Sequence, residues 1–252
     1  MVVGRSRPNL AVIFDLDGTL IDSAGKHPGA RIHKRPFVDE LLDWCAGQGI
    51  PIALWTKASR DWAADVLSRP DGLADPSGAV RDWAFVRADE GGEGGTRPYL
   101  KRLENKVFRV SSRRAVGFTR DATVIVEDTP SNCVRNFGNA IYVPRFDCVS
   151  GRKDWLRDGL GGAGNRDCGA EWSVDDLEDT HGSEAVRACL ERWERHRAGM
   201  LSREGDRLTS PLGHLARYLG ELQRLVRRGG SVRSVEKRGW LVAMTSSATS
   251  SK

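Results

Sequence analysis

The segment that most constrains the fold is residues 10–22, where an apolar run ends abruptly at two carboxylates. Residues 10–14 read Leu-Ala-Val-Ile-Phe, which has the length and β-branched content of a buried strand. Asp15 and Asp17 follow with one residue between them, and Gly18 comes next, which lets the backbone turn sharply. Ligands of open α/β sheets lie outside the carboxyl ends of the strands, so the sequence predicts a site here.

Paired acids at a strand end have few chemical uses. Two carboxylates this close repel each other unless a cation or a shared proton intervenes. Mg²⁺ takes oxygen ligands and commonly binds one or two protein carboxylates together with phosphate and water. A carboxylate can also be the nucleophile that accepts a phosphoryl group. The alternative is that one aspartate caps a turn and the other is solvated, but the full string Asp-x-Asp-Gly-Thr after a strand is more specific than an acidic pair.

Further apolar runs alternate with segments of helical periodicity. Buried strands are predicted at residues 50–55, 122–126 and 141–143, with a short one at 83–86. Helices are predicted at residues 34–45, 60–67, 183–201 and 210–226, with a helical segment reaching about residue 114. This alternation predicts an α/β fold in which crossover helices connect the strands of a parallel sheet.

Composition places the chain among soluble globular proteins. Its 252 residues are 39% hydrophobic and 29% charged, which suits one domain plus an extension. No run approaches the ~20 apolar residues of a membrane helix, and the apolar run after residues 1–8 is too short for a signal peptide. Five cysteines without a Cys-x-x-Cys pair favour a reducing compartment over disulfides or zinc. We therefore expect no membrane partner and a nuclear or cytoplasmic location.

The positive charge is concentrated in the C-terminal part. Residues 201–252 hold ten Lys and Arg against four Asp and Glu, whereas the first 200 residues hold 29 against 30. Such a basic segment is typical of proteins with acidic partners such as nucleic acid, and a solvated helix face is the alternative. The glycine-rich residues 159–165 mark a linker. We predict a domain at 9–158, a helical basic extension at 159–243, whose 210–226 helix packs on the domain, and a disordered tail at 244–252.

Polar residues also follow the other predicted strands. Thr56 ends the second strand, and Ser59 is a suitable N-cap for the helix after it; a hydroxyl beside a helix N-terminus suits a phosphate. Glu127 and Asp128 end the strand at 122–126. The chain thus carries an acidic pair, a threonine and a second acidic pair at three strand ends, and Lys101 and Lys106 precede the strand at 122–126.

This order resembles the four motifs of the haloacid dehalogenase (HAD) phosphohydrolase superfamily. Residues 34–42, 54–59, 99–103 and 126–132 resemble its FCP/SCP-like, NLI-interacting-factor-like branch, whose members are phosphatases of the RNA polymerase II C-terminal domain and related phosphoproteins. The resemblance covers about residues 9–147. It implies a HAD-like Rossmannoid three-layer sandwich with a central parallel sheet and a small or absent cap, to which the helical C-terminal extension is added.

The resemblance also implies a role for each motif residue. Asp15 attacks phosphorus and becomes an aspartyl-phosphate, while Asp17 protonates the leaving oxygen and then activates water. Mg²⁺ is held by Asp15, the backbone carbonyl of Asp17 and Asp128. Thr56 and Lys101 bind the phosphoryl oxygens. These roles agree with phosphoryl transfer as a matter of positioning and of neutralising charge on the oxygens.

Three positions qualify this assignment. Gly18 stands where the branch usually has Glu, and Glu127 stands where Asp is usual. Glu127 is one methylene longer, so it is expected to reach the metal directly or through water. Lys106 is a rival to Lys101 as the phosphate-binding lysine, and Lys101 is preferred because residues 99–103 match the run of the family.

These expectations lead to a Mg²⁺-dependent phosphatase of phosphoserine and phosphothreonine in a phosphoprotein substrate. The segments at 23–33 and 69–97 are too short for a large cap, so the site is expected to be open. The alternatives are a small-molecule or polynucleotide-end phosphatase and a non-catalytic scaffold. The basic extension favours nucleic acid, but no aromatic-rich basic groove accompanies it. The presence of both Asp15 and Asp17 argues against the scaffold.

Overall fold

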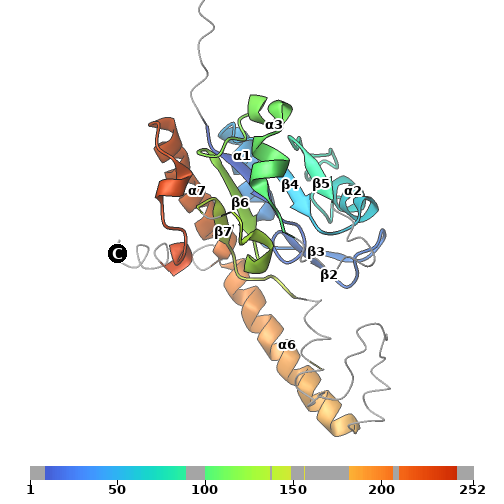
Figure 1. Cartoon of the computed structure of the whole chain (residues 1–252). Coiled ribbons are helices and arrows are strands. Elements are labelled where there is room, and N and C mark those ends of the chain that lie inside the picture. Colours follow the sequence, from blue (N-terminus) through green and yellow to red (C-terminus); the bar gives the residue numbers. More distant parts are fainter. Residues whose placement is uncertain are drawn as a thin grey trace, which may run out of the picture.

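The computed structural model describes residues 9–88, 100–136, 138–148, 156, 182–206 and 210–242. Its main sheet consists of β1 (Ala11–Phe14), β4 (Ile52–Thr56), β5 (Val86–Ala88), β6 (Thr123–Glu127) and β7 (Ala140–Tyr142), and a hairpin consists of β2 (Ile21–Ser23) and β3 (Ile32–Lys34). The helices are α1 (Val38–Gly47), α2 (Arg60–Ser68), α3 (Ser111–Ala115), α6 (Ser183–Gly205) and α7 (Pro211–Arg227), with shorter turns η1 (Glu104–Phe108), η2 (Pro130–Cys133) and η3 (Val232–Ser234). The predicted α/β class with a parallel central sheet is confirmed (Figure 1).

The sheet places β1 at the point where the strand order reverses. The order is β5-β4-β1-β6-β7, and every pairing in it is parallel. From β1 the chain crosses to β4 and β5 on one side, and later to β6 and β7 on the other. Ligands of open α/β sheets bind in the crevice at such a reversal. Asp15, the residue after β1, lies there.

The strands β1, β4, β6 and β7 alternate their side chains between two apolar cores. Val12 and Phe14 of β1 belong to the larger core, which also contains residues of α1, α2 and α7. Ala11 and Ile13 face the smaller core, which contains Leu103 and residues of η1 and η2. Both faces of β1 are fully buried, which explains why its sequence is continuously apolar rather than alternating.

Helix α7 is an integral part of the larger core. Its apolar stripe is buried against the same face of the sheet as α1, and it consists of Leu212, Leu215, Leu219, Leu222 and Val226. The prediction that this helix packs on the domain is therefore confirmed. The long helix α6 precedes it and extends away from the body of the fold (Figure 1).

The segment after the acidic pair differs from its predicted form. The supposed linker at 23–33 contains most of an antiparallel hairpin, in which Ile21 pairs with Lys34. The helix predicted from residue 34 begins only at Val38, because Lys34 is part of this hairpin and Phe37 adopts a left-handed conformation with φ 65°. A residue in this conformation cannot be part of a right-handed helix, so α1 begins at the residue after Phe37.

Two later predictions were also wrong in detail. The strand predicted at 83–86 is β5, which begins at Val86 because this residue pairs with Leu54 of β4. The helical segment expected to reach residue 114 is divided into the π-helical turn η1 and the short helix α3. Two predicted segments, the linker at 159–165 and the tail at 244–252, lie outside the described residues, as does the fifth cysteine, Cys168.

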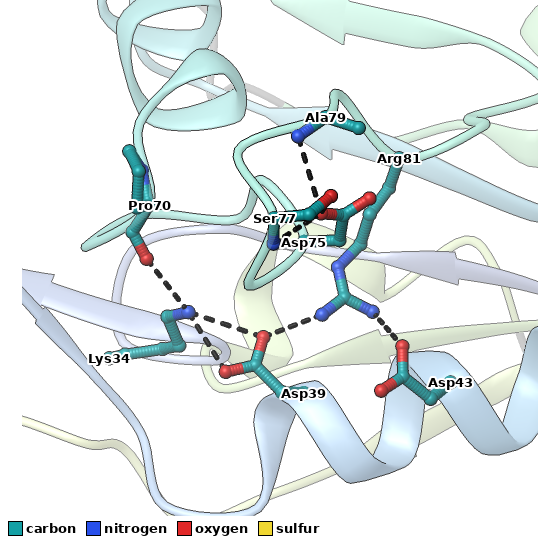
Figure 2. A network of polar contacts seen from close by, with 8 residues as sticks. All are labelled: Lys34, Asp39, Asp43, Pro70, Asp75, Ser77, Ala79 and Arg81. Carbon is teal, nitrogen blue, oxygen red and sulfur yellow. Dashed lines mark hydrogen bonds and ion pairs between the residues drawn. The ribbon is translucent and has the colours of Figure 1, made fainter.

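The segment at 69–97, an insertion after α2 of which the structure describes residues 69–88, is attached to α1 by a network of charges (Figure 2). Arg81 donates to Asp39 and Asp43 on successive turns of α1, each at 2.6 Å. Lys34 donates to Asp39 at 2.9 Å and to the carbonyl of Pro70 at 3.1 Å. Together with Asn9, Ile52 and Ala122, residues of this insertion line a cavity of about 1000 Å³ at the amino ends of the strands. Asp75, Arg81, Asp82 and Ala84 of the insertion thus lie at the sheet edge opposite Asp15.

No helix within the described ranges is long and apolar enough to cross a membrane. Cys45, Cys133 and Cys148 are buried free thiols. Burial raises the pKa of each of these thiols to about 12, so they are poor nucleophiles in the folded protein.

A buried ion pair joins the end of α6 to the segments around the acidic pair. Arg35 donates through Nε and Nη2 to the carboxylate of Glu204, at 3.0 and 2.5 Å, although the two residues are 169 positions apart. Its Nη1 donates to the carbonyls of Thr19 and Pro144 at 3.3 and 2.9 Å. The guanidinium also lies over the ring of Phe146. One arginine therefore connects the turn after Asp17, the segment after β7 and α6.

Removing one member of this pair leaves a buried charge without its counter-ion. We expect Glu204→Gln to lower the free energy of unfolding by about 3 kcal/mol, because the Arg35 side chain is fully buried. The measurement is urea unfolding followed by circular dichroism. Glu194→Gln is the control on the same helix: its pair with Arg197 is exposed, and its loss should cost about 0.5 kcal/mol or less. Equal effects of the two substitutions would contradict the role of Arg35.

Candidate active site

Four charged residues meet at the carboxyl ends of β1 and β6. The ammonium group of Lys101 forms an ion pair with Oδ1 of Asp15 and lies 2.7 Å from Oε2 of Glu127. Asp128 follows Glu127, and its side chain is only 3% exposed. Because β1 and β6 are neighbours in the sheet, residues more than 100 positions apart in the sequence come together here.

The segment after β6 fixes the position of Lys101. The backbone N–H of Lys101 donates to the carbonyl of Asn132 at 2.8 Å, and its carbonyl accepts from the side chain of Asn136. The same Asn136 side chain accepts from the N–H of Leu103 at 3.1 Å. Lys101 is thereby placed in the site, whereas the rival Lys106 is exposed on η1.

Burial sets the protonation of these groups. It raises the pKa of Asp15 above its ordinary value, although the neighbouring Lys101 acts in the opposite direction. Burial and the charge of Asp15 raise the pKa of Glu127 to about 7. Burial alone would lower the pKa of Lys101, but the carboxylates of Asp15 and Glu127 outweigh it, so this pKa is raised. Lys101 therefore keeps its positive charge. The proximity of the two buried carboxylates is reflected in the raised pKa values of Asp15 and Glu127.

The acidic residues fit a hard divalent cation. Asp15, Glu127 and Asp128 each offer an oxygen atom within 4.8 Å of the other two. Oε2 of Glu127 is buried and lies 2.7 Å from the ammonium group of Lys101. A carboxylate oxygen has further acceptor capacity beyond one such contact. An all-oxygen donor set with spare acceptor capacity is what Mg²⁺ requires.

Glu127 is held by donors on the turn that follows it. Its Oε1 accepts from the side chain of Asn132 at 2.9 Å and from the backbone N–H of Thr129 at 3.3 Å. Its other oxygen faces Lys101. The extra methylene relative to aspartate thus lets Glu127 reach the lysine while remaining within the acidic cluster.

The surroundings of residue 18 leave no space for a side chain. Its φ of +85° is in the left-handed region, and a Cβ atom there would lie 2.6 Å from Oδ2 of Asp128. Residues with a Cβ atom rarely adopt this backbone conformation. The glutamate usual in the FCP/SCP-like branch would therefore displace Asp128 in this protein, and the glycine is required by the local geometry.

Asp17 is oriented by contacts from two other elements. The indole Nε1 of Trp62, a buried residue of α2, donates to its Oδ1 at 3.2 Å. Its Oδ2 lies 3.9 Å from the ammonium group of Lys26 in the β2–β3 connection. Burial raises the pKa of Asp17, against the opposing effect of Lys26. A carboxyl group whose pKa is raised is suited to donate a proton near neutral pH.

Thr56 lies at the same edge of the sheet, at the start of the turn into α2. It is the last residue of β4, which neighbours β1, and its side chain is buried. Its Oγ1 accepts from the N–H of Ala58 at 3.0 Å, and Ser59 caps α2 by accepting from the N–H of Trp62 at 3.2 Å. The predicted N-cap is thus confirmed, and the capped turn also fixes the tryptophan that contacts Asp17.

The sequence alone did not identify several residues of the site. Trp62 had a weak signal, because it occupies the third position after a recognisable N-cap. Arg35 was noted only as part of a motif segment, and nothing indicated its partner Glu204. Lys26 and Arg145 carried no signal, because their proximity to the site depends on a hairpin and on a turn that the pattern of residues did not predict.

The fold and this cluster define a class. An acidic pair after the central strand, a buried lysine facing it and a second acidic pair on the neighbouring strand are the parts of a HAD-type phosphatase. A family model described as NLI interacting factor-like phosphatase matches residues 10–157, which is more than half of the chain. The chain belongs to this family, and the resemblance found in the sequence is confirmed.

The other comparisons add little. No curated protein sequence matches the chain. One solved crystal structure matches 88% of this chain and 98% of its own, at 16% sequence identity and a TM-score of 0.43. A similarity at this level bears on neither activity nor ligand.

The raised pKa of Glu127 makes the metal-free protein sensitive to pH. Glu127 holds its proton more tightly in the folded protein than in the unfolded chain, where its pKa is near 4.5. The free energy of unfolding should therefore fall between about pH 4.5 and pH 7, by about 3 kcal/mol from this group. Glu127→Gln should remove that part of the pH dependence.

The measurement is chemical unfolding at several pH values in the presence of a chelator. Glu40→Gln, which changes an exposed glutamate of α1, is the control and should leave the pH profile as in the wild type. A profile of Glu127→Gln that coincides with the wild type would show that Glu127 titrates normally.

Proposed function

We propose that the protein is a Mg²⁺-dependent phosphomonoester hydrolase that acts through an aspartyl-phosphate at Asp15, and that its substrate is a phosphoserine or phosphothreonine in a protein. The observation that carries this proposal is the position of Lys101, which is buried between Asp15 and Glu127 at the reversal of the strand order. A fixed cation beside a buried carboxylate suits a reaction in which that carboxylate approaches a phosphate dianion.

The first half-reaction transfers the phosphoryl group to the protein. An oxygen of Asp15 forms a bond to phosphorus while the bond from phosphorus to the substrate oxygen breaks. Asp17 gives its proton to that leaving oxygen, with its carboxyl group oriented by Trp62. Lys101 and the hydroxyl of Thr56 bind the phosphoryl oxygens, whose negative charge would otherwise oppose the approach of Asp15.

The second half-reaction regenerates the enzyme. Asp17, now ionised, takes a proton from water, whose oxygen bonds to phosphorus while the aspartyl bond breaks. Inorganic phosphate leaves, and Asp15 returns as a carboxylate. One residue serves as acid and then as base, as such a two-step hydrolysis requires.

The metal would be held by Asp15, the backbone carbonyl of Asp17 and Asp128, with Glu127 at its side. Mg²⁺ bound there would supply positive charge that offsets the charge of the phosphoryl oxygens, and it would relieve the repulsion among the carboxylates. Asp128 is kept in place for this by Thr19, whose hydroxyl lies 3.5 Å from its Oδ1, and by the space left at Gly18.

A protein substrate is supported by the arrangement around the site. The part of the insertion after α2 that contains Asp75, Arg81 and Ala84 packs against α1 and lies at the opposite edge of the sheet. The β2–β3 hairpin follows the acidic pair directly and is short. Among the described residues no further domain covers the carboxyl edge, which supports a site that admits a loop of a phosphoprotein.

The test is phosphate release from a phosphoserine peptide and from an aryl phosphate, with and without Mg²⁺. We expect release that requires Mg²⁺ and is abolished by Asp15→Asn, and rapid quenching followed by mass spectrometry should find the phosphoryl group on Asp15. Asp61→Asn, an exposed change in the first turn of α2, is the control and should retain activity. Release from neither substrate by the wild type would refute a phosphoprotein phosphatase and favour a polynucleotide end or a scaffold.

Loss of the indole donor to Asp17 should affect substrates according to their leaving groups. An alkoxide such as serine needs protonation as it departs, whereas nitrophenolate needs little. We expect Trp62→Phe to lower kcat/KM for the phosphoserine peptide about tenfold, a fraction of what general acid catalysis contributes, and to lower kcat/KM for nitrophenyl phosphate much less.

The matched control is Trp240→Phe, which removes another buried indole donor. Nε1 of Trp240 donates to the carbonyl of Tyr142 at 2.8 Å, and its loss should not change the ratio between the two substrates. Equal losses for both substrates in Trp62→Phe would mean that Trp62 acts only through stability.

A further inference from the structure

Arg145 is an exposed side chain on an unusually well fixed stretch of backbone. The carbonyl of Pro144, the residue before it, accepts from Arg35 at 2.9 Å. The N–H of Phe146, the residue after it, donates to the carbonyl of Gly18 at 2.8 Å. The backbone is therefore attached on both sides of Arg145 to the acidic-pair turn or to the arginine that supports it.

The side chain of Arg145 crosses the turn at Gly18. Its Cγ would lie 3.3 Å from a Cβ atom at position 18, so the missing side chain leaves the space that the arginine passes. Its Nε lies 4.0 Å from Oδ2 of Asp128, too far for a hydrogen bond, and the side chain is 57% exposed. The guanidinium of Arg145 thus lies near the site, and its exposed donors remain available to a ligand.

A second positive side chain lies beside Asp17, which belongs to the first acidic pair. Lys26, from the β2–β3 connection, lies 3.9 Å from Asp17 and is 61% exposed. Lys57, directly after Thr56, is also exposed. Lys26 and Arg145 therefore bring positive charge to the carboxylates from two different segments, while the buried Lys101 serves the phosphoryl group that reacts.

Exposure distinguishes these groups from the catalytic ones. Lys101 and Thr56 are buried and reach a phosphoryl group that has entered the site. Arg145 and Lys26 are more than half exposed, so they can meet groups of the substrate that remain outside. The guanidinium offers paired N–H donors in a fixed fork that matches a phosphate or carboxylate.

We propose that Arg145, with Lys26, forms a second anion-binding subsite that selects peptides carrying another phosphate near the phosphoserine to be hydrolysed. The proposal rests on the proposed function, since it assigns a preference among phosphopeptides. The second phosphate binds the guanidinium fork at the rim while the first occupies the site next to Lys101. A carboxylate from an acidic residue of the peptide occupies the same subsite more weakly, because it carries less charge.

The test compares a peptide with one phosphoserine and neutral neighbours with a series that adds a second phosphoserine at different distances on either side. For the wild type we expect kcat/KM to be at least about tenfold higher for the best doubly phosphorylated peptide, as for one charge-assisted pair. Arg145→Gln should abolish this ratio, and Arg145→Lys should retain part of it, because the charge remains without the fork.

One further measurement and one control variant separate specificity from an effect on Asp128. Binding of labelled peptides to the Asp15→Asn protein, followed by fluorescence anisotropy, should show the same preference and the same loss with Arg145→Gln. Arg238→Gln, which changes an exposed arginine paired with Glu236, is the control and should keep the wild-type ratio.

The outcomes distinguish the two proposals. Release from singly phosphorylated peptides with a ratio that Arg145→Gln leaves unchanged would overturn the subsite and leave the phosphatase intact. The same holds if Arg145→Gln lowers the rates for all peptides equally, since the arginine would then act only on Asp128. If the wild type releases phosphate from no peptide, the phosphoprotein phosphatase and the subsite both fail.

Discussion

The burial of Lys101 between Asp15 and Glu127 is the interaction on which the rest of the structure depends. Charges removed from water destabilise a protein unless their partners are held in place, and here each partner is held by a different part of the fold. Two neighbouring strands supply the carboxylates, and the asparagines after β6 position the lysine. The packing of the sheet thus determines the electrostatics of the site, and an error of register in either strand would separate the charges.

The elements with the strongest apolar signal could be predicted from the sequence. The strands β1, β4 and β6 are runs buried on both faces, and α7 has a regular stripe of leucines, so both kinds of pattern are visible without a structure. The β2–β3 hairpin was missed because its strands have three residues each, too few to show an alternation. The start of α1 was misplaced because the left-handed conformation of Phe37 leaves no mark in residue type.

The same distinction applies to the site. Parallel strands bring their carboxyl ends to one edge, so the order of Asp15, Thr56 and Glu127 along the chain was enough to place them at one edge of the sheet. The contacts of Trp62 and Arg145 were not predictable, because each joins elements whose relative position depends on the packed core. The roles assigned to the motif residues come from the resemblance to HAD phosphatases, and the structure adds how each side chain is held.

Part of the support for this site is made late in synthesis. The ribosome releases the chain from its N-terminus, so β1 and the nucleophile emerge long before the leucines of α7 and before Glu204, 169 residues after its partner Arg35. Until then the nascent sheet exposes the apolar face that α7 later covers, and such a surface attracts chaperones and aggregates. The matched family region ends at residue 157, yet the larger core is closed only by residues beyond it. The fully packed support of the active site therefore requires that α6 and α7 have been synthesised and have folded onto the sheet.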